Sequence, residues 1–331
     1  MKSYKRILLL LLIVLLLTTL LSPWVAWAWG LIIGSHPGWE EYRYTFTRIF
    51  NRMFYVLAVA SLFIFRSRMK IGSPSELGLK PPRERYGDLL VGLFLSISSM
   101  AALVITMSLT DVFTPYFRVA LPVALGRVFK ALSAGLAAGF LEEILFRGII
   151  FKGFLDDRRP VAAFVVANLL YAAIHFVKPR EKFFLSELDP RAGMVHLIYS
   201  FQPFLDLANI LPGLFGLLLI GVVLSYAFQR TGSLYLSIGL HTGWIFGLKT
   251  VRLYGDYSRA DLGWLFGSSE PKIVSGLFSW IGILAVGAIV HLMTRERPIL
   301  LLQGRSDRDE PGQRRSVPAH SGEREGPPHG G

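Results

Sequence analysis

Residues 131–151 read ALSAGLAAGFLEEILFRGIIF, an apolar stretch that nevertheless contains three charged side chains. A helix that crosses a bilayer needs about 20 predominantly apolar residues, so this stretch is long enough. Charged groups inside such a helix are costly, and by default they face the bundle interior, pair with one another and mark a functional site. Glu142, Glu143 and Arg147 therefore predict a membrane protein that carries chemistry within this helix.

The composition of the whole chain supports this class. Its 331 residues are 52% hydrophobic and only 18% charged, whereas about a quarter of an ordinary soluble domain is charged. The formal net charge is +12. Because the Lys and Arg residues lie in loops beside apolar runs, we assign them to topology and to anionic lipid rather than to nucleic acid. The absence of cysteine excludes disulfides, thiolate metal sites and a cysteine nucleophile.

The apolar runs predict an all-α polytopic bundle of about eight transmembrane helices. The predicted spans are residues 7–28, 49–65, 89–109, 121 or 131 to 155, 161–177, 210–228, 234–248 and 273–293, with an interfacial or re-entrant segment at 178–208. We favour a retained first helix over a cleaved signal peptide, because its apolar stretch is long for a signal sequence. The predicted parts are 1–70, amino-terminal helices; 71–295, the core with the last helix; and 296–331, a disordered tail.

The distribution of positive charge predicts the orientation. Most Lys and Arg residues of the short loops lie in 66–88, 152–159 and from 295 onward, on the side of the amino terminus. The positive-inside rule makes that side cytoplasmic. We therefore expect both termini in the cytoplasm and the protein in the bacterial inner membrane.

Two further spans carry histidine. Asn168, Tyr171 and His175 are spaced i, i+3, i+7 and share one helix face, and His241 lies in the seventh span. Either histidine alone could be a hydrogen-bonded core residue. However, counting about 1.5 Å per residue from the cytoplasmic helix ends places Glu142 and both histidines at similar depths. Three helices thus bring a carboxylate and two imidazoles to one level, which favours a joint site.

These groups suit two kinds of chemistry. A carboxylate beside an imidazole can deprotonate a water, and a second imidazole can stabilise an oxyanion. Glu142 is free for this task, because it is turned by about 100° from Glu143, which is spaced to pair with Arg147. The same carboxylate with His175 and His241 would also satisfy a zinc ion. The His-Glu-x-x-His helix of common metalloproteases is absent.

At these residues the chain resembles the CPBP family, which includes type II CAAX prenyl endopeptidases and bacteriocin-processing proteins. The family pattern is Glu-Glu-x-x-x-Arg, Phe-x-x-x-His and His-x-x-x-Asn or Asp, on separate transmembrane helices. Residues 142–147 match the first element completely; Tyr171 replaces the phenylalanine of the second, and Ile245 replaces the Asn or Asp of the third. The resemblance covers about residues 75–250.

The resemblance implies an intramembrane endopeptidase. It implies that Glu142 and His175 activate the water and that His241 helps to form the oxyanion site. It also implies that Glu143, itself part of the catalytic set, holds the helix geometry together with Arg147. We expect no metal or other cofactor, the alternative being zinc on the first three of these residues.

Several expectations depend on the departures from the pattern. A donor in place of the one missing at Ile245 would come from Trp244, Thr242 or Asn168.

The expected partners are the lipid bilayer and a membrane-associated or CAAX-like protein or peptide substrate, without nucleic acid. One alternative, favoured by Ile245, is a catalytically inactive scaffold or immunity-type protein. Another is an ion-coupled transporter, against which the chain shows no internal repeat.

Overall fold

The computed structural model describes residues 3–65, 73–116, 119–181, 183–251, 253–259, 261–267 and 273–297. The predicted tail beyond residue 297 and the basic residues 66–72 lie outside these ranges. The long helices are α1 (Ser3–Gly34), α2 (Phe46–Phe65), α3 (Pro82–Leu109), α4 (Leu121–Glu143), α6 (Pro160–Ile174), α8 (Leu207–Thr231), α9 (Tyr235–Val251) and α11 (Leu277–Thr294).

Short elements connect these helices. They are η1 (Glu40–Tyr42), η2 (Pro74–Leu77), η3 (Ile144–Phe151), α5 (Lys152–Asp156), α7 (Ala192–Tyr199), η4 (Gln202–Leu205), α10 (Gly263–Phe266), η5 (Ile273–Ser275) and the strands β1 (Phe113–Pro115) and β2 (Gly255–Tyr257). The predicted all-α class is confirmed, with one small addition: β1 pairs antiparallel with β2, which joins the end of α3 to the end of α9.

Four helical segments of the described chain are long and apolar enough to cross a membrane. They are Tyr4–Gly34, Pro74–Leu109, Leu207–Thr231 and Leu277–Thr294. The outside of the bundle is apolar as well: Phe94 and Phe129 are each 71% exposed, as expected of side chains that face lipid. These features indicate an integral membrane protein. Helices also cover the other four predicted spans, and their crossing of the bilayer stays a prediction.

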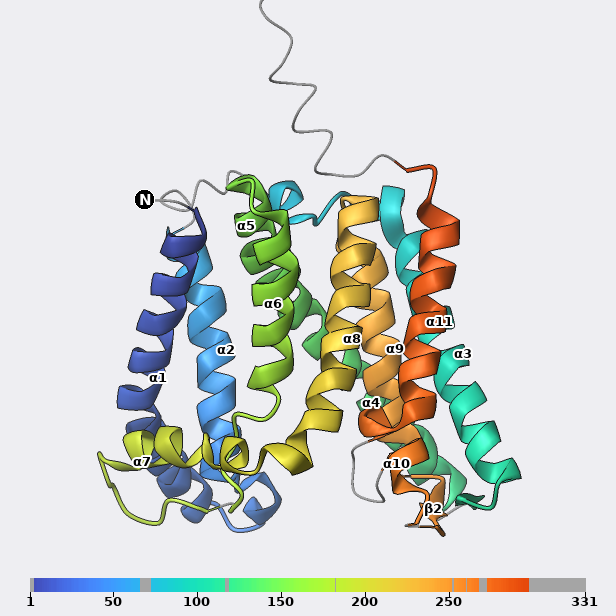
Figure 1. The fold of residues 1–331 in the computed structure, drawn as a ribbon. Coiled ribbons are helices and arrows are strands. Elements are labelled where there is room, and N and C mark those ends of the chain that lie inside the picture. The colour runs from blue at the N-terminus through green and yellow to red at the C-terminus, as the bar shows by residue number, and fades with distance from the viewer. Residues whose placement is uncertain are drawn as a thin grey trace, which may run out of the picture.

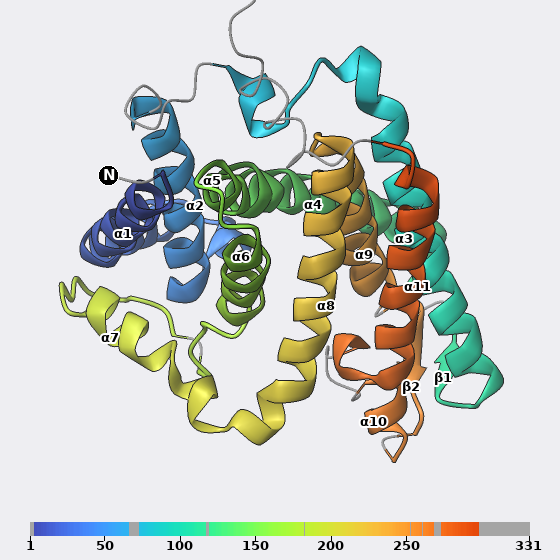
Figure 2. The same ribbon diagram turned by 45° about the horizontal axis from the view of Figure 1, so that its top comes forward.

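The long helices lie side by side, and the connections gather at the two ends of the bundle (Figure 1). The start of α1, the α5–α6 turn, the α8–α9 turn and the end of α11 lie at one end, while α7, α10 and the strands lie at the other. The segment from α4 through η3 to α5 runs obliquely across the bundle (Figure 2). The predicted span up to residue 155 is therefore helical but not one α-helix, because η3 is π-helical.

Small residues determine the position of α9, which packs against both α3 and α4. A Cβ added to Gly239 would overlap the carbonyl oxygen of Leu89 in α3. A Cβ added to Gly139 of α4 would lie 2.9 Å from the hydroxyl of Thr242. Small residues allow membrane helices to approach this closely. The close approach on both sides fixes the rotation of α9 and hence the direction of His241.

Replacing Gly239 by alanine should therefore destabilise the fold by about 1–3 kcal/mol, the usual cost of overpacking. Thermal unfolding of the purified protein in detergent measures this as a lower Tm. Gly126→Ala in α4 is the matched control, because nothing lies within 4 Å of a Cβ added there. Equal Tm values for the two variants would contradict the close packing of α3 and α9.

A buried histidine anchors α7 against α2. His196 is 1% exposed, and its ring lies 5.2 Å from that of Phe46 and 4.6 Å from that of Phe50, between centroids. Its Nδ1 has no hydrogen-bond partner among the described residues. Burial lowers the pKa of His196 from 6.5 to about 4. The imidazole is thus held neutral in this apolar setting.

The low pKa of His196 predicts a pH-dependent stability. Because the unfolded chain binds the proton more readily, the contribution is complete above about pH 6.5 and is lost as the pH falls toward 4, at up to about 1.4 kcal/mol per pH unit. Tm measured from pH 7 to 4.5 should fall less steeply in His196→Phe than in the wild type. His36→Gln, at an exposed histidine, is the control and should leave the slope unchanged.

Candidate active site

Three helices bring the predicted carboxylate and the two predicted imidazoles together. Glu142 lies near the end of α4, His175 caps the end of α6, and His241 lies in the middle of α9. The Oε2 atom of Glu142 is 3.8 Å from Nε2 of His175 and 3.7 Å from Nε2 of His241. The similar depths expected from the sequence thus correspond to a real cluster in the structure.

Glu143 joins this cluster from the side. Its Oε1 accepts hydrogen bonds from Nη1 of Arg147 and from Nδ1 of His241, both at 2.8 Å. Both members of the ion pair are 0% exposed. Nη2 of the arginine also donates to the carbonyl oxygen of Gly221 in α8, at 3.2 Å. The expected pairing of Glu143 with Arg147 is therefore present, and it extends to His241.

The hydrogen bonds of the two imidazoles determine which ring nitrogen carries the proton. Nδ1 of His175 lies 2.7 Å from the carbonyl oxygen of Tyr171, which can only accept, so Nδ1 is the donor. Nδ1 of His241 likewise donates to the carboxylate of Glu143, which Arg147 holds ionised. In its neutral form each ring therefore carries its lone pair on Nε2, the nitrogen that lies nearest the Oε2 atom of Glu142.

Three acceptor atoms consequently converge on one spot. The Oε2 atom of Glu142 has no hydrogen-bond partner among the residues that the structure describes. The distances of 3.7 and 3.8 Å from this oxygen to the two Nε2 atoms exceed a direct hydrogen bond. A water that donates its two protons to this oxygen and to one imidazole satisfies such an arrangement. The cluster can thus bind and polarise a water.

The zinc alternative requires Glu142, His175 and His241 as ligands. Within the described part of the chain, no group of three or more His, Asp or Glu residues has an arrangement that could hold a metal ion.

The predicted supporting residues have different surroundings. The hydroxyl of Tyr171 lies 3.3 Å from Nε2 of His241, at the cluster. Asn168 donates to the carbonyl oxygen of Phe164 and accepts from the hydroxyl of Ser225, so its amide is directed to α8.

The other two candidates for a substitute donor also bond elsewhere. Nε1 of Trp244 donates to Oγ of Ser99, at 3.1 Å. The hydroxyl of Thr242 donates to the carbonyl oxygen of Gly135, at 3.4 Å. None of the three donors that we considered from the sequence is therefore directed at the cluster.

One residue of the site, Tyr55, was not predicted from the sequence. The hydroxyl of Tyr55, in α2, donates to Oε1 of Glu142 at 3.3 Å. This bond leaves Oε2 as the oxygen that faces the two histidines. The available signal was a tyrosine hydroxyl inside an apolar span, which needs a partner there, but nothing in the pattern indicates which partner it has.

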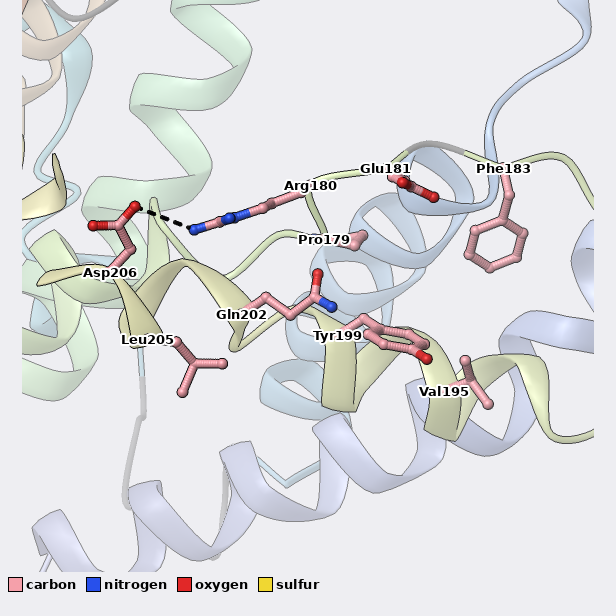
Figure 3. A pocket seen from close by; sticks show the side chains of 9 residues that line it. All are labelled: Pro179, Arg180, Glu181, Phe183, Val195, Tyr199, Gln202, Leu205 and Asp206. Carbon is pink, nitrogen blue, oxygen red and sulfur yellow. Dashed lines mark hydrogen bonds and ion pairs between the residues drawn. The ribbon is translucent and has the colours of Figure 1, made fainter.

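An apolar cavity of about 510 Å³ opens beside the cluster. Tyr171, His175 and His241 form its polar end, and apolar residues of α3, α8, α9 and α11, Ile245 among them, form its walls. A second cavity, of about 870 Å³, is lined by residues 179–181 and 183 and by the α7–η4 region (Figure 3). Arg180 and Asp206 pair across it at 3.4 Å, and it contains none of the predicted site residues. The smaller cavity is therefore the one that adjoins the cluster.

Comparison with known proteins bears on the same segment. Residues 124–247 match the family model described as type II CAAX prenyl endopeptidase Rce1-like. This segment is similar to that family. The match confirms the family resemblance read from the motifs, and it includes every cluster residue except Tyr55. No curated protein and no solved structure matches the chain. The Rce1-like match, together with the apolar helices, indicates intramembrane endopeptidase activity.

Proposed function

We propose that this protein is an intramembrane endopeptidase that hydrolyses a peptide bond with a water activated by Glu142 and His175. The observation that carries this proposal is the convergence of the carboxylate oxygen of Glu142 and the two Nε2 atoms beside an apolar cavity that both histidines line. A general base needs a free acceptor within hydrogen-bond reach of the proton that it removes. The Oε2 atom of Glu142 meets this condition.

The chemistry follows from these acceptors. The water donates one proton to Glu142 and the other to Nε2 of His175. When its oxygen attacks the carbonyl carbon, the first proton moves to the carboxylate, and the electron pair of the C=O bond moves to the carbonyl oxygen. Collapse of this tetrahedral intermediate breaks the C–N bond, and Glu142 returns the proton to the amine that leaves.

The neighbouring groups keep the acceptors in place. Tyr55 holds one oxygen of Glu142, so that the other faces the histidines. Glu143, with its charge balanced by Arg147, holds His241 on the oxyanion side of the site. In this proposal these groups orient the reacting atoms and exchange no proton with the substrate.

The apolar walls of the cavity support a membrane-associated substrate, CAAX-like or otherwise, and the surrounding lipid as the other partner. We further propose that all eight long helices cross the bilayer, with both termini in the cytoplasm. The common end of the basic connections supports this orientation. The bacterial inner membrane remains our proposed location.

The proposal can be tested with purified full-length protein in liposomes and a library of membrane-associated peptides. In water enriched in oxygen-18, hydrolysis places one heavy oxygen in the new carboxyl group, which mass spectrometry detects. Cleavage with this label, absent from a Glu142→Gln preparation of equal Tm, is the expected result. A folded wild type that bound a library peptide without cleaving it would instead favour the inactive scaffold, to which the apolar Ile245 in the cavity wall points.

Metal removal provides a separate prediction. Because the proposed reaction uses only side chains, cleavage should stay within about twofold after treatment with 1,10-phenanthroline or EDTA, followed by dialysis. Metal content measured on the same samples should not correlate with activity. Cleavage that is lost on chelation and returns with added zinc would instead make Glu142, His175 and His241 metal ligands.

A further inference from the structure

We propose that the hydroxyl of Tyr171 is the hydrogen-bond donor that stabilises the oxyanion in this chain. The inference rests on the proposed endopeptidase function and adds a catalytic residue to it. Hydrolysis of a peptide bond places a full negative charge on the carbonyl oxygen, and a site without a donor for this charge is slower by about 10²–10³-fold. The oxyanion therefore needs a hydrogen-bond donor among the side chains near the cluster.

The imidazoles of the cluster lack a free proton in their neutral forms. His175 uses the proton of Nδ1 for a backbone carbonyl oxygen, and His241 uses that of Nδ1 for Glu143. Both Nε2 atoms are therefore acceptors, as are the oxygens of Glu142. An oxyanion brought to this group of lone pairs would be repelled unless another side chain supplies a donor.

Of the other polar side chains that line the cavity, all but the exposed Ser98 already donate a hydrogen bond. The hydroxyls of Ser99, Thr106 and Ser279 donate to backbone carbonyl oxygens. Nε1 of Trp244 donates to a serine hydroxyl. The hydroxyl of Tyr55 donates to Glu142, and this residue does not line the cavity.

Tyr171 differs from these groups in position and in partner. Its hydroxyl lies 3.3 Å from Nε2 of His241, which is an acceptor in the neutral ring, and the residue lines the cavity. Its ring is 1% exposed and is held between the ring of Phe146, at 5.2 Å between centroids, and the guanidinium of Arg147, 4.4 Å above it. The hydroxyl is thus rigidly placed before the substrate arrives.

The step requires no proton transfer from the tyrosine. As the carbonyl π electrons move to oxygen, the O–H group turns from Nε2 of His241 to the oxyanion, which is the stronger acceptor because it is charged. When the intermediate collapses, the C=O bond re-forms and the hydroxyl returns to the imidazole. His241 is then a positioning residue that holds the donor, and Glu143 holds His241.

The same inference accounts for two departures from the family pattern. Tyrosine stands at 171 where the pattern has phenylalanine, and isoleucine stands at 245 where it has Asn or Asp. Ile245 lies one helical turn beyond His241 and lines the same cavity as Tyr171. Position 245 thus lacks the polar group of the family pattern, position 171 has a hydroxyl that the pattern lacks, and both residues line the same cavity.

The test uses a peptide that the wild type cleaves and the variant Tyr171→Phe, which removes one oxygen atom. We expect kcat to fall about 10²-fold with KM and Tm unchanged, because the bond exists only in the transition state. Adding Ile245→Asn to this variant should recover at least about tenfold of the lost kcat by restoring an amide donor. Tyr226→Phe is the matched control, since it removes a hydroxyl that contacts His291 between α8 and α11.

Each outcome decides the matter. A kcat of Tyr171→Phe within about threefold of the wild type would overturn the inference, and so would a loss that appears only in KM. No recovery in a double variant with wild-type Tm would refute the compensation between the two positions. If Glu142→Gln is inactive while Tyr171→Phe is fully active, the proposed function stands without this donor. If the folded wild type hydrolyses no bound peptide, both proposals fail.

Discussion

Replacing Glu142 by glutamine is expected to lower kcat about 10³-fold while the protein stays folded. Glutamine has the same shape and can still accept the hydrogen bond from Tyr55, but it cannot take a proton from water. General-base catalysis contributes about 10²–10⁴-fold. Because the lost interaction belongs to the transition state, kcat should fall and KM should change little.

Steady-state cleavage of one peptide, with Tm measured on the same samples, checks this expectation. Glu187→Gln is the matched control, since Glu187 is exposed and lies outside the cluster. Its kcat should equal that of the wild type. A Glu142→Gln variant that retained more than about a tenth of the wild-type kcat would remove this carboxylate from the role of base.

Replacing Arg147 by methionine should cause the largest loss of stability, about 3–5 kcal/mol. The change leaves the carboxylate of Glu143 fully buried without its cationic partner, and removes the hydrogen bond to the carbonyl oxygen of Gly221. The result should be a strongly lowered Tm in detergent and little folded protein in the membrane. A Tm of Arg147→Met above that of the wild type would contradict a stabilising ion pair between Arg147 and Glu143.

Two further variants separate charge from packing. Lys152 and Asp156 have the same i, i+4 spacing at 2.7 Å but are partly exposed, so Lys152→Met should cost at most about 1 kcal/mol. The double variant Glu143→Gln with Arg147→Met removes both buried charges and should recover much of the lost Tm. It should stay poorly active, because His241 no longer has a carboxylate partner.

The sequence was sufficient to predict the long helices and the depth at which the site lies along them. Apolar runs indicate the long helices, since backbone groups in lipid must be satisfied within the helix. Counting residues from the helix ends indicated that Glu142, His175 and His241 lie at similar depths, and the structure brings them together. Depth follows from rise per residue alone, which is why this part could be predicted.

Rotation and long-range contacts could not be predicted in the same way. The bond from His241 to Glu143 depends on how α9 turns between α3 and α4, which close contacts at glycines determine. The contact from Tyr55 joins residues 87 positions apart. The strands β1 and β2 have three residues each, too few for an alternating pattern.

The π-helical segment η3 has a consequence for changes in chain length. It comprises eight residues, Ile144–Phe151, and begins directly after Glu143. Its wide turns determine how Glu142 and Glu143 are rotated, about the helix axis, relative to α5 and α6. Deleting one residue here would change the rotation of the preceding carboxylates relative to the helices that follow. An insertion or deletion of a single residue in η3 would therefore alter the direction of Glu142 relative to both histidines, even if every side chain of the site were kept.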